Sequence, residues 1–295
     1  MSYFCSGNRL VRDMWPEFLS KHMDTLLEKD DLASWAVVPD TYDGMGEWAI
    51  VMPLDEGRAN ESTLLYGGDN TPSADGNPVR VSVVLHGIVQ SVNLRALGNY
   101  KGRRGAVQRA VQYLTLGGDA WTEAFDAQLH ALRCMKEYVG EVLRTTVHDA
   151  AHTEGTIHFH RPVFTPAASG LPSQLRLGDD PEGLAAGLER QWVVAHRVHT
   201  GIVDSGRAAS TCIRQGDFVA VAAAVDVVKS FRGKEWRTEL RLTMREVCRI
   251  MSVSQLAEYR PREVAEEAPV ACASRASSHM VELTVLGMDV ESDEE

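Results

Sequence analysis

The alternation of apolar and charged residues is clearest between Gly216 and Ile250. Phe218 to Val228 is almost continuously apolar and holds no proline, which predicts a buried strand. After it the pattern has period two, which predicts a strand with one dry face and one charged face. The dry set is Trp236, Leu240, Leu242 and Met244, and the charged set is Arg237, Glu239, Arg241 and Arg245. Together the two strands should form a long hairpin with a basic tip.

A second strand, tip and returning strand follow the same plan earlier in the chain. Residues 79–92 predict a strand, with a bulge near Gly87 where the inward parity shifts. Tyr100 to Gly105 is a glycine-containing basic tip that carries an aromatic ring, and residues 106–116 should return as a strand. We interpret this stretch as an architectural echo of the hairpin at 216–250 and not as a sequence repeat, because residue identity between the two is low.

The clearest helix is predicted at residues 119–146. Its apolar residues recur in steps of three and four and make one stripe, with Asp119 as a good N-cap. The stripe is typical of a helix packed on a sheet, and docking of a partner helix is the alternative. The fold class expected from these patterns is α+β, dominated by β-structure, with long hairpins and one long packed helix.

The remaining segments carry weaker patterns. A helix is expected from Trp15-Pro16 to about Lys29, and a loop rich in glycine, proline and aspartate over 55–78. Residues 184–198 fit either a helix or a strand at Trp192 to Val198, and a last short strand is expected at 280–290.

Three regions follow from this organisation. We expect an acidic N-terminal region, residues 1–78, packed on the core. A β-rich core with the long helix should occupy residues 79–257. Residues 258–295 should hold a linker, the last strand and an acidic tail.

Composition narrows the class of protein. The chain has 295 residues, of which 44% are hydrophobic and 24% charged, which suits globular domains with real cores. It contains no run of eighteen apolar residues and no apolar leader, so neither a membrane span nor a secretory signal is expected. Its five cysteines are scattered without CxxC spacing, which favours a reducing compartment, the cytoplasm or nucleus.

Charge is distributed unevenly along the chain. The net charge is −11, with thirteen acids against three bases from Asp13 to Asp69 and six acids in the last fourteen residues. In contrast, residues 229–249 hold seven bases and three acids, and residues 95–112 hold five bases and no acid. Overall acidity argues against a protein that coats duplex DNA by charge alone.

The two basic tips are the candidate binding site, because phosphates are held by clustered arginine and lysine while bases stack on exposed aromatics. An ordinary solvated hairpin is the alternative for this pattern. The candidate phosphate contacts are Lys101, Arg103, Arg104, Arg109, Lys229, Arg232, Lys234, Arg237 and Arg241. The candidate stacking residues are Tyr100, Phe231 and Trp236.

Catalytic chemistry has little support in the sequence. No nucleophile elbow, phosphate-binding loop or dinucleotide motif is present, so the sequence does not predict an enzyme, and no cofactor is expected. Two histidine pairs at HxxxH and HxH spacing could ligate a transition metal: His148, His152, His158 and His160.

Together, these features resemble the OB-fold single-stranded DNA-binding proteins. The likeness is carried by the tips Tyr100 to Gly105 and Phe231 to Trp236, the helix between strands and the acidic end, and covers roughly 79–250. It implies an OB-like antiparallel barrel and a role in DNA replication or recombination, with strands bound on one sheet face and through hairpin loops. The N-terminal third has no counterpart, and few aromatics are expected at the surface.

The predicted function is therefore binding of single-stranded DNA or RNA without sequence preference. The acidic tail, Met288 to Glu295, would recruit a protein partner or shield the groove, and a homo-oligomer is left open. Two alternatives remain: a coat or assembly protein that self-associates, and a metal-dependent enzyme built on the four histidines.

Overall fold

A computed structural model describes residues 1–23, 28–53, 61–67, 72, 77–149, 151–153, 155–176, 178–188, 190–194, 197–203, 205–232 and 235–259. Met1 to Tyr259 form one compact unit. The predicted linker after Tyr259, the last strand at 280–290 and the acidic tail lie outside the described residues. The regular elements are mostly strands, as the β-dominated α+β prediction requires.

The predicted hairpin is confirmed as the longest pair of strands. It joins β15 (Phe218–Arg232) to β16 (Glu235–Met251) in antiparallel register, with Phe231 opposite Trp236 near the tip. Both strands run longer than the sequence pattern suggested, because the pairing continues through the basic residues on either side of the tip. Gly233 and Lys234 lie outside the described residues.

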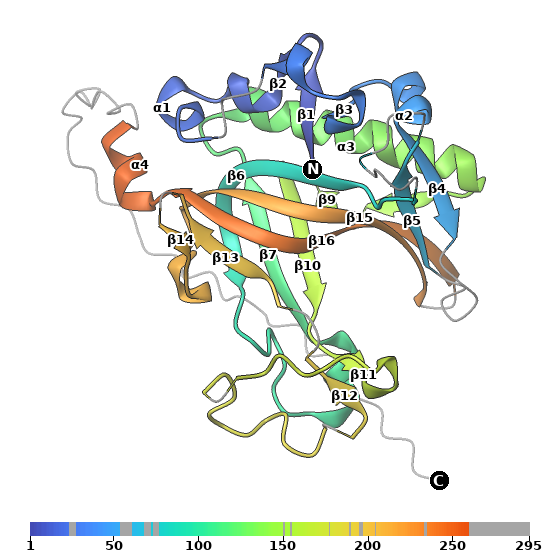
Figure 1. The fold of residues 1–295 in the computed structure, drawn as a ribbon, viewed down its shortest axis with the longest axis vertical. Coiled ribbons are helices and arrows are strands. Elements are labelled where there is room, and N and C mark those ends of the chain that lie inside the picture. Colours follow the sequence, from blue (N-terminus) through green and yellow to red (C-terminus); the bar gives the residue numbers. More distant parts are fainter. Residues whose placement is uncertain are drawn as a thin grey trace, which may run out of the picture. The chain divides into compact units, whose positions relative to one another are not determined.

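Five strands pair in a closed cycle (Figure 1). The cycle runs through β6 (Ser82–Asn93), β7 (Val111–Gly117), β10 (Thr156–Pro162), β16, β15 and back to β6. All neighbours are antiparallel except β10 and β16, which run parallel. The bulge predicted near Gly87 is found slightly later, where the register of β6 against β7 shifts between Val89 and Ser91.

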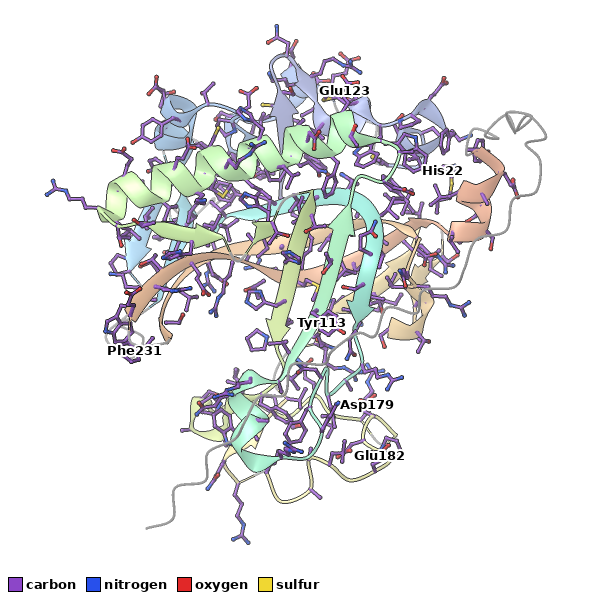
Figure 2. All side chains as sticks on the ribbon, turned by 180° about the vertical axis from the view of Figure 1, so that it is seen from behind. His22, Tyr113, Glu123, Asp179, Glu182 and Phe231 are labelled. Atoms are coloured by element: carbon purple, nitrogen blue, oxygen red, sulfur yellow. The ribbon has the colours of Figure 1, made fainter. Side chains whose placement is uncertain are left out.

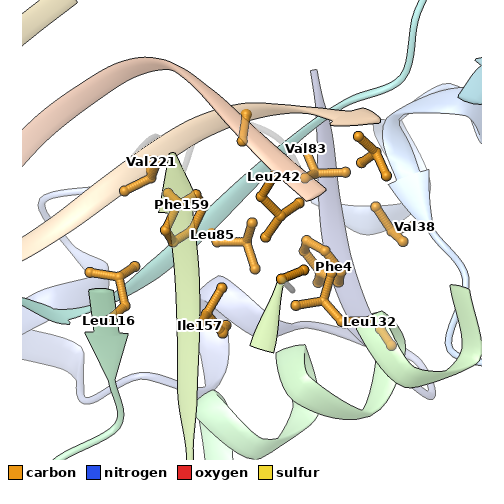
Figure 3. Packing of buried hydrophobic residues seen from close by; sticks show 14 of the residues in the cluster. Phe4, Val38, Val83, Leu85, Leu116, Leu132, Ile157, Phe159, Val221 and Leu242 are labelled. Carbon is orange, nitrogen blue, oxygen red and sulfur yellow. The ribbon is translucent and has the colours of Figure 1, made fainter. Parts of the chain in front are cut away.

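Side chains of alternate residues fill the inside of this cycle. Leu85, Leu116, Ile157, Phe159 and Leu242 are all almost fully buried and meet in one cluster (Figure 3). The period of two in each strand therefore sends one face into the core and turns the other outward. Truncation of such a core residue to alanine typically costs about 2–5 kcal/mol.

Helix α3 (Thr122–Leu143) covers one side of the cycle, as the apolar stripe predicted (Figure 1). Asp119 is not its N-cap, because Asp119 has φ of 50° and the residue before the helix is Trp121. Gln128 joins the helix to β6: its Oε1 accepts the His86 N–H, and its Nε2 donates to the His86 carbonyl, both at 2.8 Å. The buried amide thus satisfies two backbone groups that lack a strand partner at this point.

The first third of the chain packs on the helix and extends the sheet. β1 (Ser2–Ser6) pairs in parallel with β6, and β4 (Ala49–Pro53) pairs with β5 (Glu61–Tyr66), which pairs with β15. The loop predicted over 55–78 therefore contains a strand, whose buried Leu64 and Leu65 join the core. The short strands and α-helices described here are β2 (Arg9–Leu10), α1 (Glu17–Ser20), β3 (Val37–Val38) and α2 (Tyr42–Trp48). Short 3-10 helices span Val11–Met14, Lys29–Asp31 and Ser34–Ala36.

The helix predicted over 15–29 is thus only four residues long within the described part of the chain. Both sides of the predicted boundary at residue 78 contribute to the main hydrophobic cluster. Among the described residues, no helix combines the length and the hydropathy that a bilayer crossing needs.

A second, smaller core lies at the opposite side of the strands from α3 (Figure 1). We call it the lobe; it comprises the described residues of 94–110 and 163–194, and is centred on Tyr100, Phe164 and Leu188. Instead of the strand predicted from Ala106, a 3-10 helix spans Arg104–Arg109 and β7 begins at Val111. Among the described residues of the ambiguous segment 184–198, β12 (Trp192–Val193) is the one strand, and it pairs with β11 (Thr165–Pro166).

The remaining elements complete the sheet at its other edge. β13 (His199–Ile202) pairs in parallel with β16, and β14 (Gly206–Arg207) pairs antiparallel with β13. β8 (Val147–Asp149) pairs with β16, β9 (His152–Thr153) pairs with β10, and α4 (Val253–Tyr259) follows β16.

Candidate nucleic-acid interface

A groove of about 1020 Å³ lies between the outward face of the strands and the lobe. Its floor comes from β10, β16 and β15, and its far wall from residues 164–174 of the lobe. Among the described lining residues there are five arginines and a single acid, Asp226, in a chain of net charge −11. The arginines are Arg80, Arg161, Arg197, Arg241 and Arg245. A polyanion is the ligand class that such a reversal of sign favours.

Strand parity explains why the charges gather there. On β16, Leu240, Leu242 and Met244 are buried in the core, which leaves Arg241 and Arg245 on the groove side. On β15, Asp226 lies opposite Arg241 and faces the same groove. The dry and charged faces predicted for β16 are therefore correct over residues 240–245. Nearer the tip they are not, because Trp236 is exposed and Glu239 is buried.

Asp226 organises the middle of the groove. It accepts a hydrogen bond from the Arg80 guanidinium at 2.9 Å and another from the Thr243 hydroxyl at 2.8 Å. Arg80 also donates to the Thr63 hydroxyl at 3.0 Å, so its guanidinium is held at two points. A partly buried arginine held in this way is placed in advance for an anion, at the cost of having its charge partly neutralised.

Two further arginines are paired with carboxylates. Arg241 donates to Glu239, whose side chain is 5% exposed, at 2.7 Å and 3.1 Å. Arg197 makes a two-point contact with Asp179 at 2.7 Å and 3.2 Å. These pairs orient the guanidinium groups toward the groove without removing them from it.

The two histidines of β10, His158 and His160, are uncharged near neutral pH. Burial, followed by the nearby charge of Arg241, lowers the pKa of His160 to about 4. Burial also lowers the pKa of His158, which hydrogen-bonds to the Thr153 hydroxyl at 2.9 Å. His158 and His160 therefore add no positive charge to this surface near neutral pH, and the five arginines supply the permanent charge of the groove.

The hairpin tip presents two aromatic rings to solvent. Phe231 and Trp236 are each 62% exposed, and their ring centroids lie 5.5 Å apart in an edge-on arrangement. Figure 2 shows Phe231 at the end of the hairpin. Lys229 and Arg237 are exposed beside them, whereas the side chains of Arg232 and Lys234 lie outside the described residues.

At the other tip, Tyr100 to Gly105, the prediction of an exposed aromatic ring is wrong. Tyr100 is only 5% exposed and packs edge-on against Phe164 at 5.0 Å in the core of the lobe. Its ring is not available to stack on a base in this structure, because the chain at 163–194 covers it. Lys101, Arg103 and Arg109 are exposed on the lobe, and the Arg104 side chain is not described.

The two tips do not touch. The hairpin end with Phe231 and the lobe with Asp179 and Glu182 are well separated (Figure 2). The groove lies between them instead, with Val228 at its hairpin side and Leu171 at its lobe side. Of the predicted contacts whose side chains are described, only Arg241 lines the groove itself.

Sequence reasoning missed four groove arginines: Arg80, Arg161, Arg197 and Arg245. The parity that placed Arg241 also placed Arg245 on the charged face, so that signal was present in the sequence. Tyr113 was missed as well: it is 36% exposed on β7 and lies opposite His160 in the register. No short-range signal marks Arg197 or Arg80, which reach the groove through tertiary structure.

The four histidines do not assemble a metal site in the part of the chain that is described. Helix α3 ends at Leu143, so His148 and His152 lie on the separate strands β8 and β9 rather than on one helical face. His152 is buried, while His148 is exposed. Within the described residues, no three His, Cys, Asp or Glu side chains come together as a metal would require.

No protein-family model and no curated protein matches the chain. Among solved structures it is similar to gp2.5, a single-stranded DNA-binding protein encoded by bacteriophage T7, with 12% identity and a TM-score of 0.37 over 66% of this chain and 100% of that one. It is also similar to the single-stranded DNA-binding protein from bacteriophage Enc34 in complex with ssDNA, with 12% identity and a TM-score of 0.30 over 68% of this chain and 94% of that one.

Both of these are single-stranded DNA-binding proteins, the class that the sequence pattern resembles. Their identities and TM-scores are too low to carry a function over to this chain. A function for this chain must therefore rest on the residues of its own groove and hairpin tip.

Proposed function

We propose that this protein binds single-stranded nucleic acid along the groove, without strong sequence preference. The observation that carries the proposal is the concentration of five arginines against one acid among the described lining residues of one groove, in an acidic protein. Guanidinium groups contact phosphate oxygens whatever the base, which gives affinity without sequence readout.

We also propose that the closed cycle of strands is an OB-like barrel. OB-folds bind oligonucleotides on the face of their second and third strands and through the loops that join strands one to two and four to five. Counted along this cycle, the second and third strands are β7 and β10. The two loops are then 94–110 and the hairpin tip at 233–234. The basic residues from Lys101 to Arg109 fall between β6 and β7, and Lys229 and Arg237 lie on β15 and β16 beside the hairpin tip.

Each part of the surface has a distinct role in the proposal. Arginines of the groove hold phosphates, and the exposed rings Phe231, Trp236 and Tyr113 offer faces on which bases stack. Lys229 and Arg237 at the hairpin, with Lys101, Arg103 and Arg109 on the lobe, attract the strand from either side.

A single strand suits this surface better than a duplex. Stacking on protein rings needs bases that are free of their own pairs, which only a single strand offers. A net charge of −11 repels a duplex approaching on a broad front, while a narrow basic groove still admits one strand. No acid–base constellation in the described residues calls for a chemical step, so binding is the proposed activity.

The test is fluorescence anisotropy of a labelled oligothymidylate over a salt series, with an unlabelled duplex of equal length as competitor. Each phosphate neutralised on a single strand contributes about −0.7 to the slope of log K against log salt, so a few groove arginines predict a slope between about −2 and −4. A flat slope, or better competition by the duplex, contradicts the proposal.

For the acidic end, we propose competition with nucleic acid for the groove. Residues 282–295 hold six acids and no base, which gives the end the sign of the proposed ligand. A gel shift with and without residues 288–295 tests this. Removal should tighten binding of the single strand at low salt, whereas unchanged affinity would leave the acidic end without that role.

Self-association is a second candidate function, favoured by one observation. β4 ends the sheet's pairing path, and its Ile50 and Met52 are 42% and 41% exposed. An edge strand with exposed apolar residues can pair with a second copy. Light scattering on protein freed of nucleic acid checks this: a large closed oligomer supports an assembly role, and a monomer removes it.

A further inference from the structure

The five groove arginines are not equivalent. Three of them, Arg80, Arg197 and Arg241, each contact a carboxylate at 2.7–2.9 Å. Within the described part of the chain, neither Arg161 nor Arg245 has an acidic partner within 4.0 Å. These two positive charges therefore line the groove without an ion pair to any described carboxylate.

These two arginines are also neighbours. The Nη1 of Arg161, near the end of β10, donates a hydrogen bond to the carbonyl of Met244, the residue before Arg245 on the adjacent strand. This bond fixes the Arg161 guanidinium against the backbone of β16. Arg245 follows Met244 directly on β16, is exposed and lines the same groove.

The Arg161 guanidinium is not fully satisfied where it lies. Its Nε is buried and has no acceptor among the described residues. Burial, and after it the charge of Arg245, lowers the pKa of Arg161, while the more distant Asp226 acts in the opposite direction. Two like charges that act on each other in a partly buried site are stabilised by an anion that both can contact.

We propose that Arg161 and Arg245 form a dedicated phosphate site, which holds one phosphodiester group of the bound strand and fixes its position in the groove. The inference rests on the proposed function and deepens it. The guanidinium groups of Arg80, Arg197 and Arg241 already contact a carboxylate, so a phosphate must compete with that carboxylate for them. Arg161 and Arg245 have no such described contact, so a phosphate would not displace a carboxylate there. Phosphate affinity should therefore be concentrated at the end of the groove where β10 meets β16.

The test compares two variants of the full chain that make the same change of charge in the same groove. Arg245→Gln removes an arginine that has no described acidic partner. Because Arg245 is exposed, this substitution should leave the fold intact. Arg80→Gln removes a paired one, and Asp226 keeps the Thr243 hydrogen bond at 2.8 Å. Arg241 is a poorer control, because its loss would remove the salt-bridge partner of the buried Glu239 carboxylate.

The measurement is the salt dependence of the Kd for oligothymidylate, with circular dichroism to show that both variants fold. We expect Arg245→Gln to weaken binding about tenfold and to make the log–log salt slope shallower by about 0.7, the value for one phosphate. Arg80→Gln should change the slope by much less. Equal effects of the two variants would overturn the inference.

A further variant, at Arg161, tests the same phosphate site without any change at position 245. Arg161→Lys keeps the charge but loses the planar, two-point geometry, so it should weaken binding while the salt slope stays closer to that of the unmodified chain. Wild-type affinity in Arg161→Lys and Arg245→Gln alike would refute the phosphate site and leave the groove proposal standing. Failure of the unmodified chain to bind any single strand would instead refute the proposed function.

Discussion

His86 should make the folded protein sensitive to mild acid. It sits on β6, is 5% exposed, and lies parallel to the Phe218 ring at 6.4 Å between centroids. Burial, and then the nearby Arg12, lowers the pKa of His86 from 6.5 to about 4. The folded protein therefore holds this imidazole neutral in conditions where the unfolded chain would take up a proton.

The sign and size of the effect follow from linkage. Below pH 6.5 the unfolded state binds the proton first, so the free energy of unfolding falls as the pH drops toward 4. Below pH 4 both states are protonated and His86 adds no further loss. One pKa unit corresponds to about 1.4 kcal/mol, so the loss attributable to His86 is about 3 kcal/mol across this window.

The assay is urea unfolding at a series of pH values between 7 and 4, on the unmodified chain and on His86→Leu. Leucine has a similar volume and takes no proton, so carboxylate titrations common to both proteins cancel in the comparison. We expect the stability gap between the two to shift by about 3 kcal/mol in favour of the variant as the pH falls. Parallel pH profiles would refute the reasoning.

Three further outcomes are expected. Gln128→Leu leaves the His86 N–H and carbonyl without their partner, and should lower the free energy of unfolding by about 2 kcal/mol in urea titrations. Phe231→Ala and Trp236→Ala should each weaken binding of a single strand by about 1–3 kcal/mol in anisotropy, with an unchanged melting temperature because both rings are exposed. Gly98→Ala should lower the melting temperature of the protein, since Gly98 has φ of +55° and an added Cβ would strike the backbone of Val111.

Much of the fold could be predicted from local periodicity. The hairpin of β15 and β16 and helix α3 were visible because their apolar positions repeat with period two and near 3.6 over long stretches. β5 was missed because it is short and lies in a stretch rich in turn-forming residues. Its assignment depends on pairing with β15, which is a tertiary effect.

The candidate site was harder to predict, because the groove is made by segments far apart in the chain. Arg80, Arg161 and Arg197 come together only when the cycle of strands closes and the lobe folds beside it. Tyr100 illustrates the opposite error. Its setting of glycine and arginine suggests an exposed loop, yet Phe164 and its neighbours bury the ring.

The central claim is that a single strand lies in the groove between the hairpin and the lobe. Photo-crosslinking of a bromouracil-substituted oligonucleotide, with the crosslinked peptides identified by mass spectrometry, tests it most directly. We predict crosslinks to peptides that carry Tyr113, His160, Phe231 and Trp236. Crosslinks confined to α3, which covers the opposite side of the strands from the lobe, would contradict it.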